Sequence, residues 1–424
     1  GTHRDYTLYA KYVTLARTIS TKEQLVTLAN DVNAGQSFAG QGIQLAADLN
    51  LSGVSFPVIG SALTTPFSGV FSGNGHQITN LAVSGKPAAG LIGALGAGGI
   101  VTGVSVAGSV AGNMAGGIVG NNMGGIIEHC SFNGSVSASA TPIKVISQNL
   151  RVNSSADLHG AADRHTPLKN ILLACDSPDI IGFQEADATW QSYLPSDFSA
   201  YSYVWTWRGL GSNNTTQGKE ATPVFYKKSK FDLVDSGSFW LSSTPGSPSY
   251  CFNESMNRIV TWVKLRVKTT GEIICYFNTH FPLDEDSRNQ SVAVLKEKVL
   301  SITGGLLPTY ITADYNMTRG SSPYNLMTAW CQDLGSAAQT DATNNSGTFN
   351  GFSVTPTSLI DFCFGFTERT AVPYYKVVLD TYTDSSGRVC PPSDHYAIYL
   401  ETTLESGSGP IAGINKGTLY HCQG

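Results

Sequence analysis

Two patterns of hydrophobic and polar positions divide the chain. Up to about residue 140, short stretches of alternating apolar and polar residues, such as Ile78 to Val83, end at Gly or Asn-Gly corners. Alternation with a period of two predicts half-buried strands, and the frequent corners predict a chain that turns every few residues. From Pro142 onward, continuous apolar stretches alternate with amphipathic ones, which predicts buried strands combined with helices. The pattern therefore predicts two structural units of different class.

The first part repeats a unit of roughly 23–27 residues, a length typical of solenoids. The segment Gly75 to Gly85 matches Gly99 to Gly108, and Gly125 to Gly134 continues the pattern. A single coil cannot bury its apolar face, whereas stacked coils can. We therefore expect an all-β, glycine-rich solenoid over residues 1–140.

These repeats resemble the GLUG-type repeats of large bacterial surface and secreted proteins, over about residues 18–137. The resemblance implies a structural or adhesive role and an extracellular location, either secreted or on the surface of a bacterial cell. We also expect a larger parent polypeptide. A helical pattern over residues 18–32, with Ser20 or Thr21 as N-cap, predicts one short helix within this part.

The last residues return to the glycine-rich pattern. Gly417 to Cys422 aligns with Gly125 to Cys130, which predicts a returning solenoid coil over residues 403–424. The simplest arrangement is an insertion of residues 141–402 between two consecutive coils.

The inserted part alternates apolar strands with amphipathic segments. Residues 168–175 and 290–302 have helical patterns. The predicted strands are the apolar stretches at 143–147, 180–183, 221–226, 259–265, 273–277, 310–312, 359–364 and 397–400.

Polar residues with catalytic chemistry lie at or near the ends of most of these strands. Strand ends are where an α/β scaffold gathers a site, because the apolar strands fix the positions of the polar residues that follow. The residues concerned are Asn149, Gln184-Glu185, Asn278-Thr279-His280, Asp314-Tyr315-Asn316, Asp361 and Ser393-Asp394-His395.

The ordered motifs Gln-Glu, Asn-Thr-His, Asp-x-Asn and Ser-Asp-His resemble those of the endonuclease/exonuclease/phosphatase superfamily, the fold of deoxyribonuclease I and exonuclease III. The resemblance spans residues 142–402. Each motif alone has low specificity, whereas their order and intervals together are specific. The resemblance implies an α/β (α+β) four-layer sandwich that hydrolyses phosphate esters with the help of a divalent metal.

The implied metal ligands are Glu185, Asp394 and Asn149, all of which offer oxygen atoms. Hard oxygen ligands suit Mg²⁺, which takes few protein carboxylates and keeps several waters. The resemblance therefore implies Mg²⁺ or Mn²⁺ as cofactor, with Ca²⁺ as a further option.

The resemblance also implies the catalytic groups. His395 forms a pair with Asp361, whose carboxylate orients the imidazole. Asp314 and Asn316 hold or activate the attacking water and contact a phosphate oxygen. Asn149 lies close to these groups as well as to the metal.

Three further residues complete the implied site. His280, with Glu220 as its partner, stabilises charge on the phosphoryl oxygens or assists the leaving group. Arg258 supplies a fixed positive charge near the phosphate. A structural salt bridge is the alternative interpretation of Glu220 and of Arg258. The segments 210–217 and 247–257 are expected to form walls of the substrate pocket.

Composition sharpens the choice of substrate. Residues 1–140 hold 24 of the 45 glycines but only 10 of the 57 charged residues, five of each sign. Residues 141–402 hold 20 Lys+Arg against 25 Asp+Glu, so the whole net charge of −5 lies there. High-affinity nucleic-acid binders usually have a basic face. The charge therefore favours a phosphate ester of a sugar, glycan or lipid head group.

Two alternative functions stay open. A nonspecific DNase-like or RNase-like nuclease uses the same motifs, and nucleic acid is a disfavoured but allowed partner. A surface adhesion module without catalysis is the second alternative.

No apolar stretch approaches the ~20 residues of a membrane helix, so we expect no membrane span. The eight cysteines are widely spaced and form no CxxC pair that would indicate zinc.

Overall fold

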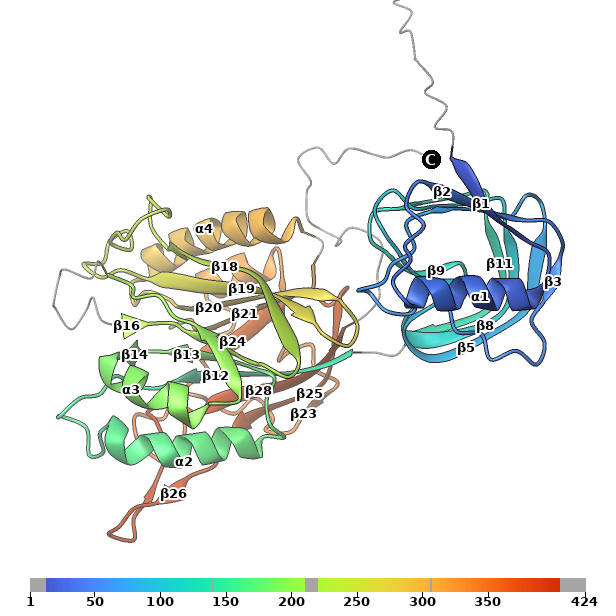
Figure 1. Ribbon diagram of the computed structural model, residues 1–424. Helices are drawn as coiled ribbons and strands as arrows, with labels where there is room; N and C mark the ends of the chain where they lie inside the picture. Colours follow the sequence, from blue (N-terminus) through green and yellow to red (C-terminus); the bar gives the residue numbers. More distant parts are fainter. Residues whose placement is uncertain (1–12, 139–140, 210–219, 306, 405–424) are drawn as a thin grey trace, which may run out of the picture. The chain divides into compact units, whose positions relative to one another are not determined.

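The computed structural model describes residues 13–138, 141–209, 220–305 and 307–404 (Figure 1). The chain divides into two compact units, with the boundary between Ala140 and Thr141. Of the predicted returning coil, only Thr403 and Leu404 are described, and both belong to the last strand of the second unit. The rest of that coil lies outside the described residues. No helix in the described ranges is long and apolar enough to cross a membrane.

The first unit is a β-solenoid whose strands pair in parallel from coil to coil. Its largest apolar side chains, such as Phe67 and Phe71, point inward and are buried. The strands form three sheets, in the order β1(Thr14–Ile19), β2(Gln41–Leu45), β4(Val70–Ser72), β7(Ile100–Thr102), β10(Ile126–Glu128); then β11(Ser131–Ala138), β8(Ser105–Ala115), β5(Gln77–Ala89), β3(Leu49–Asn50); and β6(Ile92–Leu95) with β9(Val119–Asn122).

The pairing register confirms one predicted repeat match and corrects the other. Ser131 pairs with Ser105, 26 residues earlier, as the match of the last two repeats requires. The match of Gly75 with Gly99 is wrong by four residues, because the Gly75 amide donates to the Gly103 carbonyl at 3.3 Å. Strand β5 carries two register irregularities in its pairing with β8. Each irregularity is an extra residue that shifts which residues of β5 and β8 pair, while the repeat pattern in the sequence stays the same.

The helix of the first unit, α1(Lys22–Asn33), begins four residues later than predicted. Thr21 is its N-cap: its hydroxyl accepts from the Gln24 amide at 3.3 Å, and the Gln24 side chain accepts from the Thr21 amide at 3.1 Å. This reciprocal capping box satisfies two amides that the helix leaves unpaired. Thr18 and Ile19, which were predicted as helix, belong to strand β1 instead. Leu25 and Leu28 are buried, as their spacing predicts.

The second unit consists of four layers, which confirms the predicted fold class. Two sheets lie face to face in the middle, with α4 outside one of them and α2 and α3 outside the other (Figure 1). The helices are α2(Ala161–Ala174), α3(Ala188–Asp197), α4(Glu285–Thr303) and α5(Ser322–Thr328). Between the sheets lies an apolar core that includes Val145, Val263 and Ile398.

The two sheets are mixed and have unequal size. The first has the order β15(Tyr201–Val204), β17(Val224–Lys227), β13(Ile180–Gln184), β12(Thr141–Asn149), β28(Ala397–Leu404), β25(Thr370–Val378), β23(Thr340–Asp341). The second has the order β18(Phe231–Trp240), β19(Ile259–Val267), β20(Ile273–His280), β21(Thr309–Asp314), β24(Asp361–Gly365), β22(Gln332–Asp333). Two-stranded ribbons are formed by β14(Ala186–Asp187) with β16(Glu220–Ala221), and by β26(Tyr382–Thr383) with β27(Val389–Cys390).

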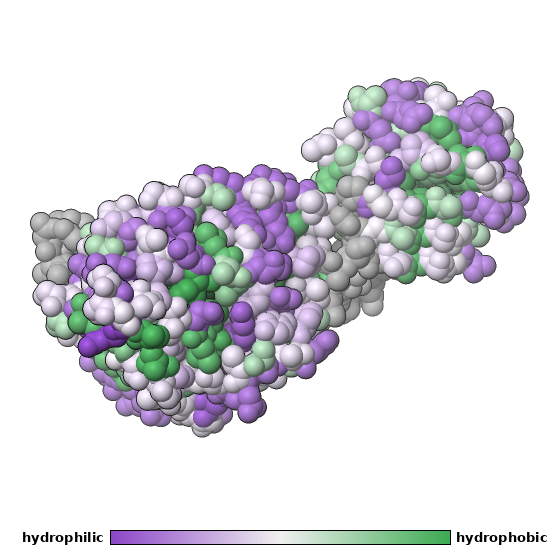
Figure 2. All heavy atoms as spheres, turned by 90° about the horizontal axis from the view of Figure 1, so that it is seen from below, coloured by the Kyte–Doolittle hydropathy of each residue, from purple (hydrophilic) through white to green (hydrophobic). Residues whose placement is uncertain are grey.

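Several element boundaries differ from the prediction. The strand predicted over 221–226 is divided into β16 and β17, and Pro223, which has no amide to donate, lies in the gap between them. Helix α2 begins at Ala161, seven residues before the predicted start. The pattern missed its first turns because they are polar, and one of the residues that they bury is the charged Arg164. Figure 2 shows hydrophobic residues in small patches among hydrophilic ones on the visible face of this unit.

Close stacking of the solenoid coils makes some glycines irreplaceable. A Cβ atom on Gly73 would lie 2.3 Å from the Gly103 carbonyl oxygen and 2.4 Å from the Val104 Cα atom. We expect Gly73→Ala to destabilise the solenoid unit by about 3 kcal/mol, because backbone atoms must move apart. Gly98→Ala is the matched control: Gly98 has φ +77° but open space around it, and left-handed strain alone costs about 1 kcal/mol. Calorimetric unfolding measures both, and equal losses would contradict the steric explanation.

Candidate active site

The predicted site residues converge at one edge of the two sheets. Strand β12 ends at Asn149, β20 at His280 and β21 at Asp314, while β24 begins at Asp361. An open pocket of about 480 Å³ lies there. Eight of the ten predicted residues line it, namely Glu185, Glu220, Arg258, His280, Asp314, Asn316, Asp394 and His395. The other two, Asn149 and Asp361, are buried directly behind residues that line the pocket.

A buried polar network connects the two sheets beneath the pocket. The Gln184 amide donates to the Asn278 side-chain oxygen at 2.7 Å and to the Ser147 hydroxyl at 3.0 Å. The Thr312 hydroxyl donates to the same Asn278 oxygen at 3.1 Å. The Gln and Asn of two sequence motifs therefore hold the sheets together, while the residues that follow them in sequence face the pocket. Gly182 permits this approach, since a Cβ atom there would lie 2.7 Å from the Asn278 oxygen.

Asn149 joins two carboxylates of the site. Its amide nitrogen donates to Asp314 at 3.0 Å and to Glu185 at 3.2 Å. The second Glu185 oxygen accepts from the Val152 amide at 3.0 Å. Both carboxylates are therefore held in fixed orientations, and Asn149 uses its donors on them. Its own side-chain oxygen accepts from the Arg151 amide at 2.9 Å.

Two site residues adopt left-handed backbone conformations. Glu185 has φ +56° and Asn316 has φ +49°. Such conformations cost of order 1–3 kcal/mol in a residue with a side chain and persist where the surroundings impose them. Glu185 immediately follows strand β13, and Asn316 lies two positions beyond the end of strand β21. The turn in each case directs the side chain into the pocket.

His395 and Asp361 form a hydrogen-bonded pair. The Nδ1 atom of His395 lies 2.8 Å from an Asp361 oxygen, and its Nε2 atom lies 3.6 Å from Asp314. Burial lowers the pKa of His395, but the charges of Asp361 and Asp314 outweigh it and raise the pKa to about 10. His395 is therefore a cation at neutral pH in this geometry. The Phe349 ring meets the imidazole edge to face, with centroids 5.2 Å apart, and limits its rotation.

The Asp314 carboxyl group lies in the centre of the site. It accepts from the Asn316 amide at 2.9 Å as well as from Asn149. Burial raises the pKa of Asp314 to about 7, with the charge of His395 opposing this shift and that of Asp361 adding to it. Asp314 therefore binds a proton more readily than an ordinary aspartate does.

His280 differs from His395 in its charge state. Its Nε2 atom lies 3.1 Å from the Asn316 side-chain amide and 3.4 Å from Asp314. Burial lowers the pKa of His280 well below its usual value, and the charges of Arg258 and Arg208 lower it further. His280 is therefore neutral. Its Nδ1 atom is buried and makes no hydrogen bond within the described part of the chain.

Glu220 lies at the distance limit of an ion pair with its predicted partner. Its carboxylate is 4.0 Å from His280 Nδ1, whereas it accepts a hydrogen bond from the Arg208 guanidinium at 2.6 Å. Burial raises the pKa of Glu220 to about 7 against the opposing charge of Arg208. Arg258 lies 3.7 Å from Glu254, and its Nε atom is buried without a hydrogen bond to any described residue.

Two arginines of the pocket were not predicted from the sequence. Arg151 lies 3.9 Å from Asp394 and is held by Asp157 at 3.0 Å. Arg208 also lines the pocket. Their positions follow from the fold rather than from any motif, although Arg151 lies only two residues beyond the end of β12. Of the predicted walls, residues 247–257 contribute Met256, and residues 210–217 lie outside the described part.

The site offers the ligands of a divalent cation. One oxygen or nitrogen atom each from Glu185, His280 and Asp314 lies within 4.8 Å of the others. A cation would reduce the repulsion among carboxylates that burial has already brought together, as the raised pKa of Asp314 indicates. Burial likewise raises the pKa of Asp394, which lines the same pocket. The donor set therefore fits a hard metal ion.

The sequence family agrees with this geometry. The model of the Endonuclease/Exonuclease/phosphatase family matches residues 146–395, and the chain belongs to this family. It is accordingly a hydrolase, and both the fold class and the family predicted from the motifs are confirmed. The model of the GLUG motif matches residues 111–137. No curated protein matches the chain.

Solved structures of bacterial family members have the same fold as the second unit. A family protein from Bacteroides thetaiotaomicron is 27% identical, with a TM-score of 0.58, and the match covers 63% of this chain and 99% of that one. A mannosyl-6-phosphatase from the same species is 28% identical, with a TM-score of 0.56 and coverage of 61% and 99%. A protein from Bacteroides vulgatus is 27% identical, with a TM-score of 0.56 and coverage of 62% and 100%.

The charge of His395 depends on its carboxylate partner. We expect Asp361→Asn to lower the pKa of His395 from about 10 toward the ordinary histidine value, because the variant removes the largest effect that raises it. NMR titration of the imidazole Cε1 proton in metal-free protein measures the shift. Asp232→Asn is the control, since Asp232 is exposed on β18 and does not line the pocket. A His395 pKa that does not change in Asp361→Asn would show that the pair does not set its charge.

Proposed function

We propose that the second unit is a divalent-metal-dependent phosphoesterase that acts on phosphate esters of sugars or glycans. The observation that carries this proposal is the pocket itself, in which Glu185, Asp314 and His280 face the same space as the buried guanidinium of Arg258. Carboxylates for a cation and a guanidinium for an anion are the two requirements of phosphate-ester hydrolysis. The similarity to a mannosyl-6-phosphatase supports a sugar phosphate as substrate.

The metal ligands in this proposal are Glu185 and Asp394, with Asn149 holding the Glu185 carboxylate in place. His280 and Asp314 are close enough to Glu185 to contribute further atoms. A bound cation supplies positive charge that neutralises a phosphate oxygen and makes phosphorus easier to attack. Mg²⁺ and Mn²⁺ suit this oxygen-rich set, and Ca²⁺ is accepted by similar ligands.

The protein's own residues move the protons. Asp314 is the proposed proton acceptor for the attacking water, because its carboxylate is fixed by Asn149 and Asn316 and its pKa lies near neutrality. His395, charged and fixed by Asp361, donates hydrogen bonds to the phosphoryl oxygens. His280 is neutral, and its imidazole lies on the other side of Asp314.

Arg258 is the proposed phosphate-binding residue. Its side chain is buried, so its charge is screened little by water. A guanidinium matches two phosphate oxygens at once, which fixes the orientation of the ester. The other two pocket arginines, Arg151 and Arg208, form closer ion pairs, with Asp157 at 3.0 Å and with Glu220 at 2.6 Å, than the 3.7 Å contact of Arg258 with Glu254. Because two of the three pocket arginines are engaged in these ion pairs, the pocket favours one bound phosphate group over a long polyanion.

Loss of a metal ligand should abolish catalysis. We expect Glu185→Gln to lower kcat for p-nitrophenyl phosphate or mannose 6-phosphate by about 100-fold or more, since transition-state charge is no longer neutralised. Chelation with EDTA should give the same loss in the wild type, and Mg²⁺ or Mn²⁺ should restore it. Glu297→Gln, on the exposed face of α4, is the matched control. Full activity of Glu185→Gln would contradict the proposed metal site.

The substrate class is decided by the same assay with other esters. Faster hydrolysis of a sugar monophosphate than of bis-p-nitrophenyl phosphate, glycerophosphate or plasmid DNA supports the proposal. Metal-dependent plasmid cutting that His395→Ala abolishes would favour a nuclease instead. No turnover of any ester by folded, metal-loaded protein would favour the non-catalytic adhesion module.

Arg258 should bind the phosphate group both in the substrate and in the transition state. We expect Arg258→Ala to lower kcat/KM by about 10- to 100-fold, the effect of one lost hydrogen bond to a charged group. Arg258→Lys should recover part of this loss, because it keeps the charge but not the two-pronged geometry. Circular dichroism must show that both variants are folded. Equal kcat/KM in all three proteins would exclude Arg258 as a phosphate ligand.

We further propose that the protein acts outside a bacterial cell, which the GLUG-like repeats of the first unit support. Fractionation of the source cells tests this location. Recovery of the chain only from the cytoplasm would overturn it.

A further inference from the structure

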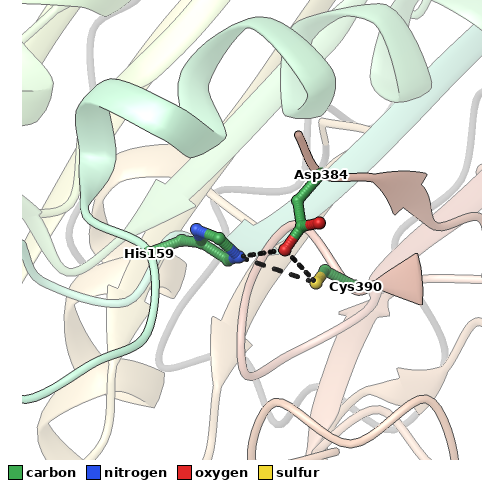
Figure 3. Close-up of side chains that lie close together, drawn as sticks. All are labelled: His159, Asp384 and Cys390. Atoms are coloured by element: carbon green, nitrogen blue, oxygen red, sulfur yellow. Dashed lines mark hydrogen bonds and ion pairs between the residues drawn. The ribbon is translucent and has the colours of Figure 1, made fainter. Parts of the chain in front are cut away.

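A second group of metal-ligating side chains lies outside the pocket described above. His159, Asp384 and Cys390 point toward one another, from the loop before α2 and from the β26–β27 ribbon (Figure 3). The His159 Nε2 atom lies 3.1 Å from an Asp384 oxygen and 3.7 Å from the Cys390 sulfur. The sulfur lies 3.8 Å from the same Asp384 oxygen. None of the three residues lines the active-site pocket.

The arrangement is not that of a catalytic triad. In a triad, the nucleophile and the carboxylate contact opposite nitrogens of the histidine ring. Here both Asp384 and Cys390 face Nε2, so the sulfur cannot pass a proton through the ring to the carboxylate. Three different ligand atoms instead surround one common point.

The triangle of ligand atoms has the size that tetrahedral zinc requires. Bonds of about 2.0 Å to nitrogen and oxygen and about 2.3 Å to sulfur, at tetrahedral angles, separate nitrogen from oxygen by about 3.3 Å and sulfur from either by about 3.5 Å. The corresponding separations here are 3.1, 3.7 and 3.8 Å. We propose that His159, Asp384 and Cys390 bind a zinc ion, with the fourth position open to water or an external ligand.

Neighbouring groups hold two of these ligands in position. The other Asp384 oxygen accepts from the Ser386 and Arg388 amides, both at 2.9 Å, which leaves the oxygen that faces His159 available. The Tyr382 ring meets the His159 imidazole edge to face, with centroids 6.1 Å apart, while Asp163 lies 4.0 Å from Nδ1, beyond hydrogen-bond distance. The set of sulfur, nitrogen and oxygen donors distinguishes this site from the sulfur-free active site and favours zinc over Mg²⁺.

A metal at this site would brace the segment that enters the active site. Cys390 lies three residues before Ser393, whose hydroxyl donates to the Asn149 carbonyl at 2.7 Å. The buried Arg164 donates to the carbonyls of Leu150 and Pro392, at 2.6 and 3.1 Å, and so links the same two segments. The zinc site is therefore a positioning site for the residues around Asp394, and it takes no part in the chemistry.

Cobalt spectroscopy of the full chain tests the site. Metal-free, reduced protein is titrated with Co²⁺, whose bond to a thiolate gives an intense near-ultraviolet charge-transfer band. We expect this band to saturate at one equivalent and to disappear when Zn²⁺ is added in slight excess. The active site contributes no such band, because none of its pocket residues is a cysteine. Glu185→Gln should therefore leave the band unchanged.

Variants identify the ligands. Cys390→Ser should lose the band, whereas Cys130→Ser, which changes a partly buried cysteine in the solenoid, should keep it. If circular dichroism shows that Cys390→Ser is unfolded, His159→Gln decides, and it should weaken Co²⁺ binding by at least about 100-fold, since it removes a direct ligand. Absence of the band in the wild type, its persistence in folded Cys390→Ser, or unchanged affinity in His159→Gln would overturn the proposal.

Discussion

The hydrogen bonds of one amide group hold the site together. Asn149 donates to Glu185 and to Asp314, which follow or end strands of different sheets. Without these bonds the two carboxylates would lack a fixed separation, and their mutual repulsion would favour rotation toward solvent. The amide carries no net charge, so it orients both groups without neutralising either. The carboxylates consequently remain available to a cation.

The layered fold makes this bond possible. Face-to-face packing places the ends of β12 and β21 at the same edge, and the apolar core between the sheets fixes their separation. The hydrogen bond between Gln184 and Asn278 also fixes how one sheet lies on the other, because it forms only where these two side chains meet. The strands therefore set the positions of the charged residues, and the buried neutral amides then fix the orientation of their side chains.

The sequence was most informative where one apolar strand led directly to a polar residue. Asn149, His280 and Asp314 lie at such ends, and the register of a strand fixes which face its last residue occupies. Arg151 and Arg208 could not be predicted in this way, because their approach to the pocket depends on loops. The hydrogen-bond partner of Glu220 could not be predicted for the same reason, because that partner is Arg208. Strands β18 and β25 were not predicted either, since polar residues such as Asp232 in β18 and Lys376 in β25 interrupt their apolar pattern.

The active site and the proposed zinc site differ in what a sequence can reveal. The active-site ligands follow strands, and their motifs occur in a fixed order, so the pattern indicated them. Asp384 and Cys390 are six residues apart, but His159 is separated from them by 225 and 231 residues. Only the fold brings the three together. Because one site offers hard oxygens and an imidazole while the other adds a thiolate, the two can select different metals from the same solution. A chain that needs one ion for chemistry and another for rigidity gains from keeping sulfur out of the first site.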